Sequence, residues 1–516
     1  MKRLRIAVVM LVALASVFGL ESVYGATVKS NKSSTPPNSS ITVTGTGFGA
    51  SELVDVYLDT VDMMLAVSDA AGAFSVKLKI PAEAVPGNHT IIAAGRKSGT
   101  AAQKPLVVAA SWQQVGFNGR HSGANPYENI LSPWTVSSLN QEWETVIGAG
   151  LYTTPVILNG AYLFVTSTDG KLYKINTETG KVIWSKLPSS GIFSQTVSPA
   201  LASTSTGWLI IAATDTSVSA VKESDGSIAW SYNMPQGVSY TITVDGGIAY
   251  FNRGSQFHAV TVNNGKPVGG FPITLTGSMD SCAAVTGGKI FLTVPNGVTA
   301  GTSRLYAYSA ATGIELWHAD LPSNICGAPA NGPIAANGIV YIGVQRISGV
   351  ESEVHAFNLH NGARLWNTGT TSSANIGDSI CAAPVVYKGS IYVPSNDHYL
   401  YAFNARTGAF RWKLQLSAQL AAPIVANGVL YVATYDNSLH AVDCATGTYL
   451  WGAVLNYNMM LSPLVVDGRL YATTYYQSIF CFSLNPELRA QAAAPLRKID
   501  PKELVPDYTL TPQSAR

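Results

Sequence analysis

Short runs of alternating apolar and polar residues fill most of the chain. Five such runs lie between residues 41 and 108, separated by turn sequences such as Gly45-Thr46-Gly47 and Pro86-Gly87. Alternation with a period of two is typical of half-buried strands. Several short strands in so short a stretch predict a small antiparallel β-sandwich over residues 41–110.

A longer pattern recurs from Trp112 to about Asn485. An aromatic residue or a His is followed about six residues later by a Gly and, after three intervening residues, by a Trp. The copies end at Trp184, Trp230, Trp317, Trp366, Trp412 and Trp451, and a seventh has Gly269 in place of the Trp. The aligned glycines are 39 to 49 residues apart, a period that indicates a repeat architecture.

Each repeat also contains an upstream hairpin, clearest at Asn427-Gly428 between two alternating runs. Four short strands per repeat match one blade of a β-propeller. An eighth repeat, starting at Leu461, lacks an outer strand, and Leu139–Glu144 supplies an unpartnered Trp143 before the first repeat. We therefore predict an all-β, eight-bladed propeller over 111–485, in which an N-terminal strand completes the last blade.

These repeats resemble those of the pyrroloquinoline-quinone (PQQ) family of eight-bladed propellers, and the lead-in Trp112–Pro126 resembles that of the same family. The resemblance covers nearly three quarters of the chain. It implies either a quinoprotein dehydrogenase that oxidises alcohols or sugars, or a cofactor-free binding scaffold. The sandwich resembles bacterial immunoglobulin-like modules, which implies a spacer or an adhesion unit.

The chain begins like an exported protein. Residues 1–25 have a basic start, a 15-residue apolar stretch from Ile6 to Leu20 and small residues before Ala26, which predicts a signal peptide; the alternative is an uncleaved anchor. Residues 26–40 predict a linker and 486–516 a disordered tail. The first cysteine is Cys282, so we expect a periplasmic or extracellular protein, not a lipoprotein, with no transmembrane span after cleavage.

Composition excludes several classes of function. Only 12% of residues are charged and the net charge is +2, so we expect no nucleic-acid partner. The five cysteines contain no Cys-x-x-Cys or adjacent pair, which gives no support to thioredoxin chemistry, haem attachment or a zinc knuckle. At most two disulfides can form, and their pairing stays open.

The candidate site lies on the predicted funnel face, where loops between blades and loops in the middle of each blade meet. The resemblance to dehydrogenases implies PQQ and calcium there, although the adjacent cysteines of many relatives are missing. Carboxylates, an amide and guanidinium groups could bind a cation and a poly-acid. Alternatively, the acids cap turns and the cysteines fill the core or bridge neighbouring blades. The candidate ligand-binding residues are Asp280, Asn324, Asp378, Arg253 and Arg346.

Periodic aromatic residues predict packing rather than chemistry. His258, His355 and His440 occupy one repeat position and point radially from different blades, so we predict no metal site. The repeated Trp residues predict docking between blades. They are Trp143, Trp184, Trp230, Trp317, Trp366, Trp412 and Trp451.

The leading interpretation is a monomeric, non-catalytic scaffold that binds a protein or a cell-envelope polymer and needs no cofactor. The alternative is a PQQ- and calcium-dependent dehydrogenase. A third possibility is a purely structural surface protein.

Overall fold

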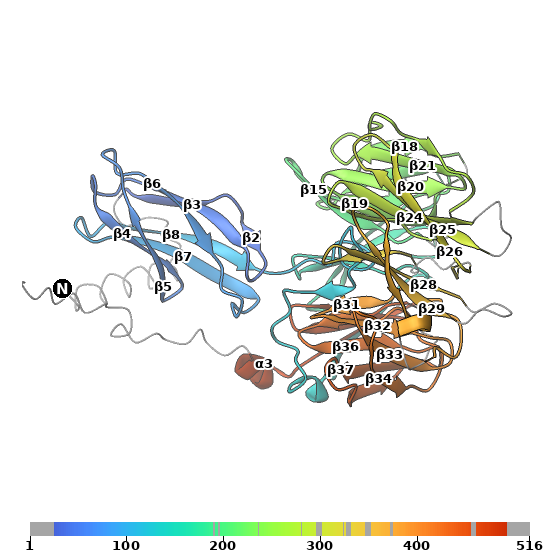
Figure 1. Cartoon of the computed structure of the whole chain (residues 1–516). Helices are drawn as coiled ribbons and strands as arrows, with labels where there is room; N and C mark the ends of the chain where they lie inside the picture. The colour runs from blue at the N-terminus through green and yellow to red at the C-terminus, as the bar shows by residue number, and fades with distance from the viewer. Residues whose placement is uncertain are drawn as a thin grey trace, which may run out of the picture. The chain divides into compact units, whose positions relative to one another are not determined.

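The computed structural model describes residues 25–492 except for 189–190, 195–196, 236, 280, 296–301, 324, 327–331, 346–351, 372–374 and 456–460. The chain divides into two compact units, with a boundary between Ala109 and Ala110, and the second unit extends to Arg489 (Figure 1). The predicted signal peptide lies outside the described residues except for Gly25. None of the described helices has the length and apolar character needed to cross a membrane.

The first unit contains two β-sheets. Three strands form one sheet in the order β1-β3-β6, and five form the other in the order β2-β8-β7-β4-β5. Pairing is antiparallel except between β2 and β8. The strands are β1 (Thr27–Ser30), β2 (Ser34–Thr35), β3 (Ser40–Thr46), β4 (Leu53–Leu58), β5 (Val61–Val67), β6 (Phe74–Lys79), β7 (Gly87–Gly95) and β8 (Ala101–Val108).

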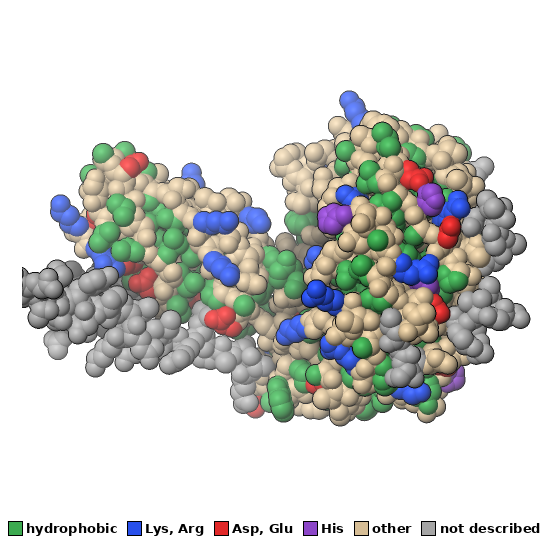
Figure 2. Space-filling view, viewed as in Figure 1, with side chains coloured by type: hydrophobic (Ala, Val, Ile, Leu, Met, Phe, Trp, Pro, Cys, Tyr) green, Lys and Arg blue, Asp and Glu red, His purple; other side chains and the backbone are tan. Residues whose placement is uncertain are grey.

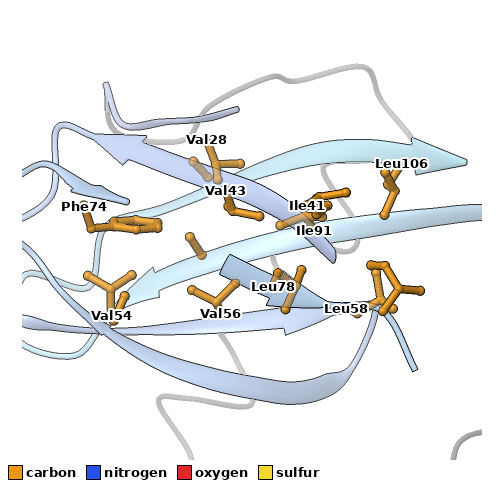
Figure 3. Close-up of a cluster of buried hydrophobic side chains, with 14 of the residues drawn as sticks. Val28, Ile41, Val43, Val54, Val56, Leu58, Phe74, Leu78, Ile91 and Leu106 are labelled. Atoms are coloured by element: carbon orange, nitrogen blue, oxygen red, sulfur yellow. The ribbon is translucent and has the colours of Figure 1, made fainter. Parts of the chain in front are cut away.

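Both sheets contribute to one hydrophobic core. Val43 and Leu78 from the three-stranded sheet and Val56 and Ile91 from the five-stranded sheet are all buried in the same cluster (Figure 3). Every second side chain of a strand faces the same side, so the alternating pattern places these residues together. The unit is a two-layer sandwich, and its assignment as immunoglobulin-like stays a prediction.

Two parts of the sandwich differ from the sequence prediction. β1 and β2 lie within 26–40, so the linker prediction is wrong for those residues. β5 was not predicted, because a bulge leaves Met63 without an opposing residue on β4. The extra residue breaks the two-residue alternation on which the prediction depended.

The described residues of the second unit form eight small sheets. The first four are β11–β14 (Val156–Leu158, Tyr162–Thr166, Leu172–Asn176, Val182–Lys186), β15–β18 (Ala200–Thr204, Gly207–Ala213, Ser217–Lys222, Ile228–Asn233), β19–β22 (Ser239–Asp245, Ile248–Arg253, Gln256–Thr261, Ile273–Thr274) and β23–β26 (Ala284–Thr286, Lys289–Pro295, Ser303–Ser309, Glu315–Leu321).

The last four sheets include two strands from the beginning of the unit, β9 and β10. They are β27–β30 (Ile334–Ala336, Ile339–Val344, Glu353–Asn358, Arg364–Asn367), β31–β34 (Val385–Tyr387, Ser390–Pro394, Tyr399–Asn404, Phe410–Gln415), β35–β38 (Ile424–Ala426, Val429–Ala433, Ser438–Asp443, Tyr449–Val454) with β9 (Ala124–Asn125), and β39–β41 (Leu464–Val466, Arg469–Thr473, Ser478–Ser483) with β10 (Asn140–Val146). The short helices are η1 (Val136–Ser138), α2 (Thr368–Thr371) and α3 (Pro486–Ala492).

Successive sheets pack on one another through shared hydrophobic clusters. Val156 and Phe164 of the first sheet pack with Leu201 and Ile210 of the second, and further clusters join the following pairs as far as the seventh sheet. Four-stranded sheets stacked face to face in chain order make a β-propeller, which confirms the predicted fold class.

The eighth sheet joins the two ends of this series. β10 pairs with β41 in antiparallel fashion, which confirms the predicted N-terminal closing strand. Its Trp143 donates a hydrogen bond from Nε1 to the carbonyl of Thr177 in the first sheet, at 3.0 Å. On the other side, the ring of Trp451 in the seventh sheet lies 5.3 Å from that of Phe482 in the eighth. The series of sheets therefore closes on itself.

The repeated Gly and Trp residues pack against each other across neighbouring sheets. Trp412 on β34 lies opposite the small Ala402, and its ring covers Gly447 of the next sheet, where an added Cβ would lie 2.7 Å from the ring. Its Nε1 donates a hydrogen bond to a carbonyl three residues before that Gly. The equivalent bonds join Trp143 to Thr177, Trp230 to Val262, Trp317 to Leu359, Trp366 to Ala405 and Trp412 to Cys444.

The third sheet lacks the Trp and uses an aliphatic residue instead. An added Cβ on Gly313 of the fourth sheet would lie 2.5 Å from Cγ2 of Ile273 on β22. The irregular repeat at Gly269 therefore keeps the same type of contact with a smaller side chain.

Connections alternate between the two ends of the propeller, because the strands of each sheet are antiparallel. One end carries the turns between first and second strands and between third and fourth strands; we call it the turn face. The other end is the funnel face. α3 follows the last strand, and Arg489 on it donates a hydrogen bond to the carbonyl of Asp467 at 2.9 Å. The prediction of a disordered tail over 486–516 is therefore wrong at its start, and residues 493–516 lie outside the described residues.

Candidate functional site

The segment Trp112–Asn125 runs through the middle of the propeller. Trp112 exchanges two backbone hydrogen bonds with Ile157 on β11, at 2.8 and 2.9 Å. The next contacts are made with the innermost strands of six more sheets. They join Gln113 to Leu201, Gln114 to Val244, Gly119 to Val285, Arg120 to Ala335, Gly123 to Val425 and Asn125 to Val465. We call this segment the plug, because it is hydrogen-bonded to the innermost strands of seven sheets.

A buried histidine attaches the plug to the third and fourth sheets. Nε2 of His121 lies 3.2 Å from the hydroxyl of Thr243, and that hydroxyl donates its own proton to the carbonyl of Ala283. Nε2 must therefore carry a proton, and Nδ1 accepts a hydrogen bond from the thiol of Cys282 at 3.3 Å. Burial lowers the pKa of His121 to about 4 and raises the pKa of Cys282 to about 12, so both groups are neutral.

Sequence analysis identified this lead-in but not its path. The available signal was its glycine content. Gly116 and Gly123 have φ values of +68° and +65°, a region that favours glycine. A Cβ on Gly123 would also lie 2.8 Å from Val385 on β31. Three glycines within eight residues therefore indicated a chain that approaches other backbones closely.

Two of the five predicted ligand-binding residues are described, and they lie on the funnel face. Arg253, at the end of β20 in the third sheet, is exposed. Asp378 is half-buried before β31 in the sixth sheet, where its Oδ1 accepts a hydrogen bond from the amide of Ser379 at 2.6 Å. Between these two described residues there is no hydrogen bond or ion pair. Asp280, Asn324 and Arg346 lie outside the described residues, so the site stays a prediction.

Two cysteines of this face form a disulfide. Cys326 precedes the fifth sheet and Cys381 the sixth, and the bond joins them across 55 residues. The bond therefore ties together two neighbouring connections of the funnel face. Cys282, Cys444 and Cys481 are buried and take no part in this bond.

Tyrosines cluster where the eighth and first sheets meet on the funnel face, a feature that the sequence analysis missed. The rings of Tyr152 and Tyr475 lie 3.9 Å apart at 76°, and that of Tyr476 lies 6.2 Å from Tyr475. Backbone hydrogen bonds hold the two loops together, including one from Leu151 to the carbonyl of Tyr475. Tyr476 is 56% exposed and Tyr435, from the seventh sheet, 40%, so aromatic surface faces solvent here.

Carboxylates line the mid-sheet loops of the same face. Asp169 accepts hydrogen bonds from the hydroxyl of Tyr173 and the amide of Lys171. Burial alone would raise the pKa of Asp169, but these hydrogen bonds outweigh burial and lower it. Asp397 accepts the equivalent bond from Tyr401 at 2.5 Å. Both loops are therefore held by a hydrogen bond between a tyrosine hydroxyl and a carboxylate.

The three repeat histidines lie on the third strands of three different sheets, and each has a local partner. His258 lies 3.1 Å from the hydroxyl of Tyr232, His355 3.0 Å from the carboxylate of Glu353, and His440 3.0 Å from the hydroxyl of Thr434. Among the described residues, no group of three or more His, Cys, Asp or Glu side chains is placed to hold a metal ion.

Comparisons with known proteins divide between assembly factors and dehydrogenases. The chain is 23% identical over 270 residues to the outer membrane protein assembly factor BamB of Yersinia pestis, covering 49% of this chain and 62% of BamB. The chain thus spans about three fifths of the length of this relative. It is also 30% identical over 162 residues to the quinohemoprotein alcohol dehydrogenase of Comamonas testosteroni, covering 29% of this chain and 22% of the enzyme.

Solved structures show the same division. BamB from Moraxella catarrhalis superposes with a TM-score of 0.50 at 13% identity, covering 67% of this chain and 99% of BamB. The Comamonas testosteroni enzyme gives 0.54 at 13% identity, covering 72% of this chain and 80% of the enzyme. At such identities the likeness concerns the fold alone. A family model described as outer membrane protein assembly factor BamB matches residues 132–281, 256–419 and 350–472. These matches span well over half of the chain, which therefore belongs to this family of PQQ-repeat propellers.

Proposed function

We propose that this protein is an exported scaffold without catalytic activity, which binds a protein or a cell-envelope polymer through the funnel face of its propeller. The observation that carries the proposal is the cluster of Tyr152, Tyr475 and Tyr476. Exposed tyrosines supply large, rigid contact surfaces with a polar tip, and they are enriched where proteins bind partners.

The position of the plug favours binding of a partner on the funnel face over binding inside the central channel of the propeller. The plug is hydrogen-bonded to seven innermost strands, so we expect a partner to bind on the surface rather than in the channel. The names of the BamB relatives describe assembly factors of the outer membrane, which favours a protein partner in the cell envelope.

Export is supported by the sequence of residues 1–25 and by the Cys326–Cys381 disulfide, because disulfides persist in oxidising compartments. We place the mature chain in the periplasm or outside the cell, as a monomer without an N-terminal lipid. The sandwich would act as a spacer or as a second contact.

A photo-crosslinking amino acid at position 476, introduced in the native cells, tests the binding face. We expect a crosslinked product of defined mass that disappears when Tyr152 and Tyr475 are both changed to Ala. The same amino acid at the exposed Thr206, on the turn face, is the matched control and should give no such product. Equal products at the two positions, or none at position 476, would contradict the proposal.

A PQQ- and calcium-dependent dehydrogenase is the second candidate, favoured by the similarity to the quinohemoprotein enzyme. Arg253 and Asp378, the described members of the predicted set, lie on the third and sixth sheets and do not by themselves make a quinone or calcium site. Incubation with PQQ and calcium should give neither a bound-quinone absorbance nor alcohol-dependent dye reduction. Saturable quinone binding with turnover of an alcohol or a sugar would establish the enzyme instead.

A further inference from the structure

Three exposed cations gather at one end of the sixth sheet, on the turn face. Lys388 lies in the turn between β31 and β32, Arg406 in the turn between β33 and β34, and Arg411 near the start of β34. None of the three forms an ion pair with a described carboxylate; Arg411 donates a hydrogen bond to the hydroxyl of Ser390. Figure 2 shows Lys and Arg side chains gathered over the part of the propeller where β31 and β36 lie.

Acidic residues are few near the three cations. The described carboxylates of the sixth sheet, Asp378 and Asp397, lie at its opposite end, on the funnel face. In the seventh sheet, Asp443 is on the turn face, where it accepts hydrogen bonds from the amides of Ala445 and Thr446. The sixth sheet is therefore basic at one end and acidic at the other.

Lys388 is an unusual residue type for its position in the turn between the first and second strands of a sheet. At the equivalent position four other sheets have Asn159, Asn337, Asn427 and Asp467, and two have Gly246 and Gly287, all at φ near +50°. Asn and Asp tolerate this left-handed region, whereas Lys adopts it at a cost. Lys388 nevertheless has a φ of +42°. Lys388 therefore brings a cation to this exposed turn, where Asn or Gly would adopt the same backbone conformation with less strain.

A largely exposed tryptophan lies on the same face, in a loop that contacts the seventh sheet. Trp134 is 91% exposed, and its loop is fixed, because the amide of Ser132 donates to the hydroxyl of Thr135 and that hydroxyl donates to the carbonyl of Ile130. Pro133 contacts the turn at Gly428 of the seventh sheet, the sheet on which Trp412, next to Arg411, docks. Tyr449, 50% exposed at the start of β38, adds a second aromatic ring at this end.

We propose that these five residues, Lys388, Arg406, Arg411, Trp134 and Tyr449, form a docking surface for an anionic phospholipid membrane. Each cation near such a surface strengthens binding about fivefold. Tryptophan and tyrosine favour the depth of the lipid headgroups, and a rigid loop presents Trp134 without an ordering cost. An acidic protein would satisfy the cations but would not require a solitary exposed indole. The proposal concerns the turn face and does not depend on funnel-face binding.

Co-sedimentation of the full-length mature protein with vesicles tests the proposal. The probes are phosphatidylcholine vesicles with and without about 30 mol% phosphatidylglycerol, a charge density sufficient to attract basic clusters. We expect binding only with phosphatidylglycerol, and its loss in about 0.5 M salt, which screens such charges. The combined K388Q, R406Q and R411Q variant should bind roughly 100-fold more weakly. W134S should weaken binding severalfold at unchanged charge.

The matched control removes the same charge from the same face elsewhere. Lys181, Lys222 and Lys266 are exposed near the outer turns of the first three sheets, and their combined change to Gln should reduce binding less than threefold. If the two triple variants lose vesicle binding equally, the net charge alone attracts the membrane, and the proposed docking surface is wrong. Absence of phosphatidylglycerol-dependent binding would also overturn the proposal. Polyglutamate serves as a second probe, and binding to polyglutamate without binding to vesicles would mean that the cations recognise an acidic protein.

Discussion

Lys174 on β13 and Glu223 of the next sheet form an ion pair, and Nζ of Lys174 also donates a hydrogen bond to the backbone carbonyl of Glu223 at 3.2 Å. Five other sheets offer the equivalent carbonyl to the Nε1 of a docking Trp. Here Lys174 stands opposite Trp184, where other sheets have a small residue. Nε1 of Trp184 is buried without a hydrogen-bond partner among the described residues. Lys174 therefore occupies the carbonyl of Glu223, to which Trp184 would otherwise donate.

This arrangement predicts unequal effects of removing the two partners. Glu223→Ala leaves a buried ammonium with one neutral acceptor and should lower the free energy of unfolding by about 3 kcal/mol. Lys174→Ala leaves a carboxylate that is partly solvated and frees the carbonyl for Trp184, so the loss should be near 1 kcal/mol. Urea unfolding of both variants measures the difference. Equal losses of unfolding free energy in the two variants would mean that Trp184 does not replace Lys174 as the donor to the carbonyl of Glu223.

The contact between Gly447 and Trp412 predicts a second pair of unequal substitutions. Gly447 and Gly338 have similar φ values, +74° and +78°, but an added Cβ would meet the Trp412 ring at 2.7 Å in the first case and nothing within 4 Å in the second. Gly→Ala should therefore cost roughly 1 kcal/mol at position 338, from backbone strain alone. At position 447 overpacking should add 1–3 kcal/mol. The difference between the melting temperatures of the two variants measures the cost of overpacking against Trp412. Equal decreases in melting temperature would mean that this cost is absent.

Periodicity in the sequence was sufficient to predict the propeller. Gly and Trp recur because the Trp of one sheet packs on the Gly of the next. Each sheet therefore needs both residues, and Gly447 and Trp451 have the same spacing as Gly180 and Trp184. The closing strand was predictable for the same reason, since Trp143 has no Gly four residues before it and no preceding strands of its own repeat. Repeated contacts leave a repeated signal in the sequence.

Contacts that occur once leave no such signal. The plug is held largely by its backbone, as when Gly119 accepts a hydrogen bond from Val285, and backbone carbonyls do not identify their partners in the sequence. The tyrosine cluster joins Tyr152 to Tyr475, which are far apart in the chain and lie in loops without periodicity. A bridge between neighbouring blades was one of the alternatives, but the pairing of Cys326 with Cys381 depends on the paths of two loops, which spacing does not reveal.

The Cys326–Cys381 disulfide should stabilise the propeller through the unfolded chain. Closing a loop of 55 residues restricts the unfolded state by an entropy that corresponds to about 4 kcal/mol, before any strain in the folded state is subtracted. A variant with both residues changed to Ser should unfold at a lower urea concentration. Reduction should lower the midpoint of the wild type to that of the variant and leave the variant unchanged. A midpoint insensitive to both changes would contradict a structural role for the bond.

Buried His121 predicts acid sensitivity of the plug. Its pKa is lowered from 6.5 to about 4 in the folded state, so between these values the unfolded chain binds more protons and stability falls as the pH falls. The contribution of His121 is complete above pH 6.5, and roughly 2.5 kcal/mol of it should be lost by about pH 4.5. His121→Gln keeps a donor for Thr243 but does not titrate, so the wild-type advantage should shrink over this interval. Urea unfolding at several pH values, with His318→Gln at an exposed site as the control, measures this change. A constant difference between wild type and H121Q would mean that His121 is not held neutral in the fold.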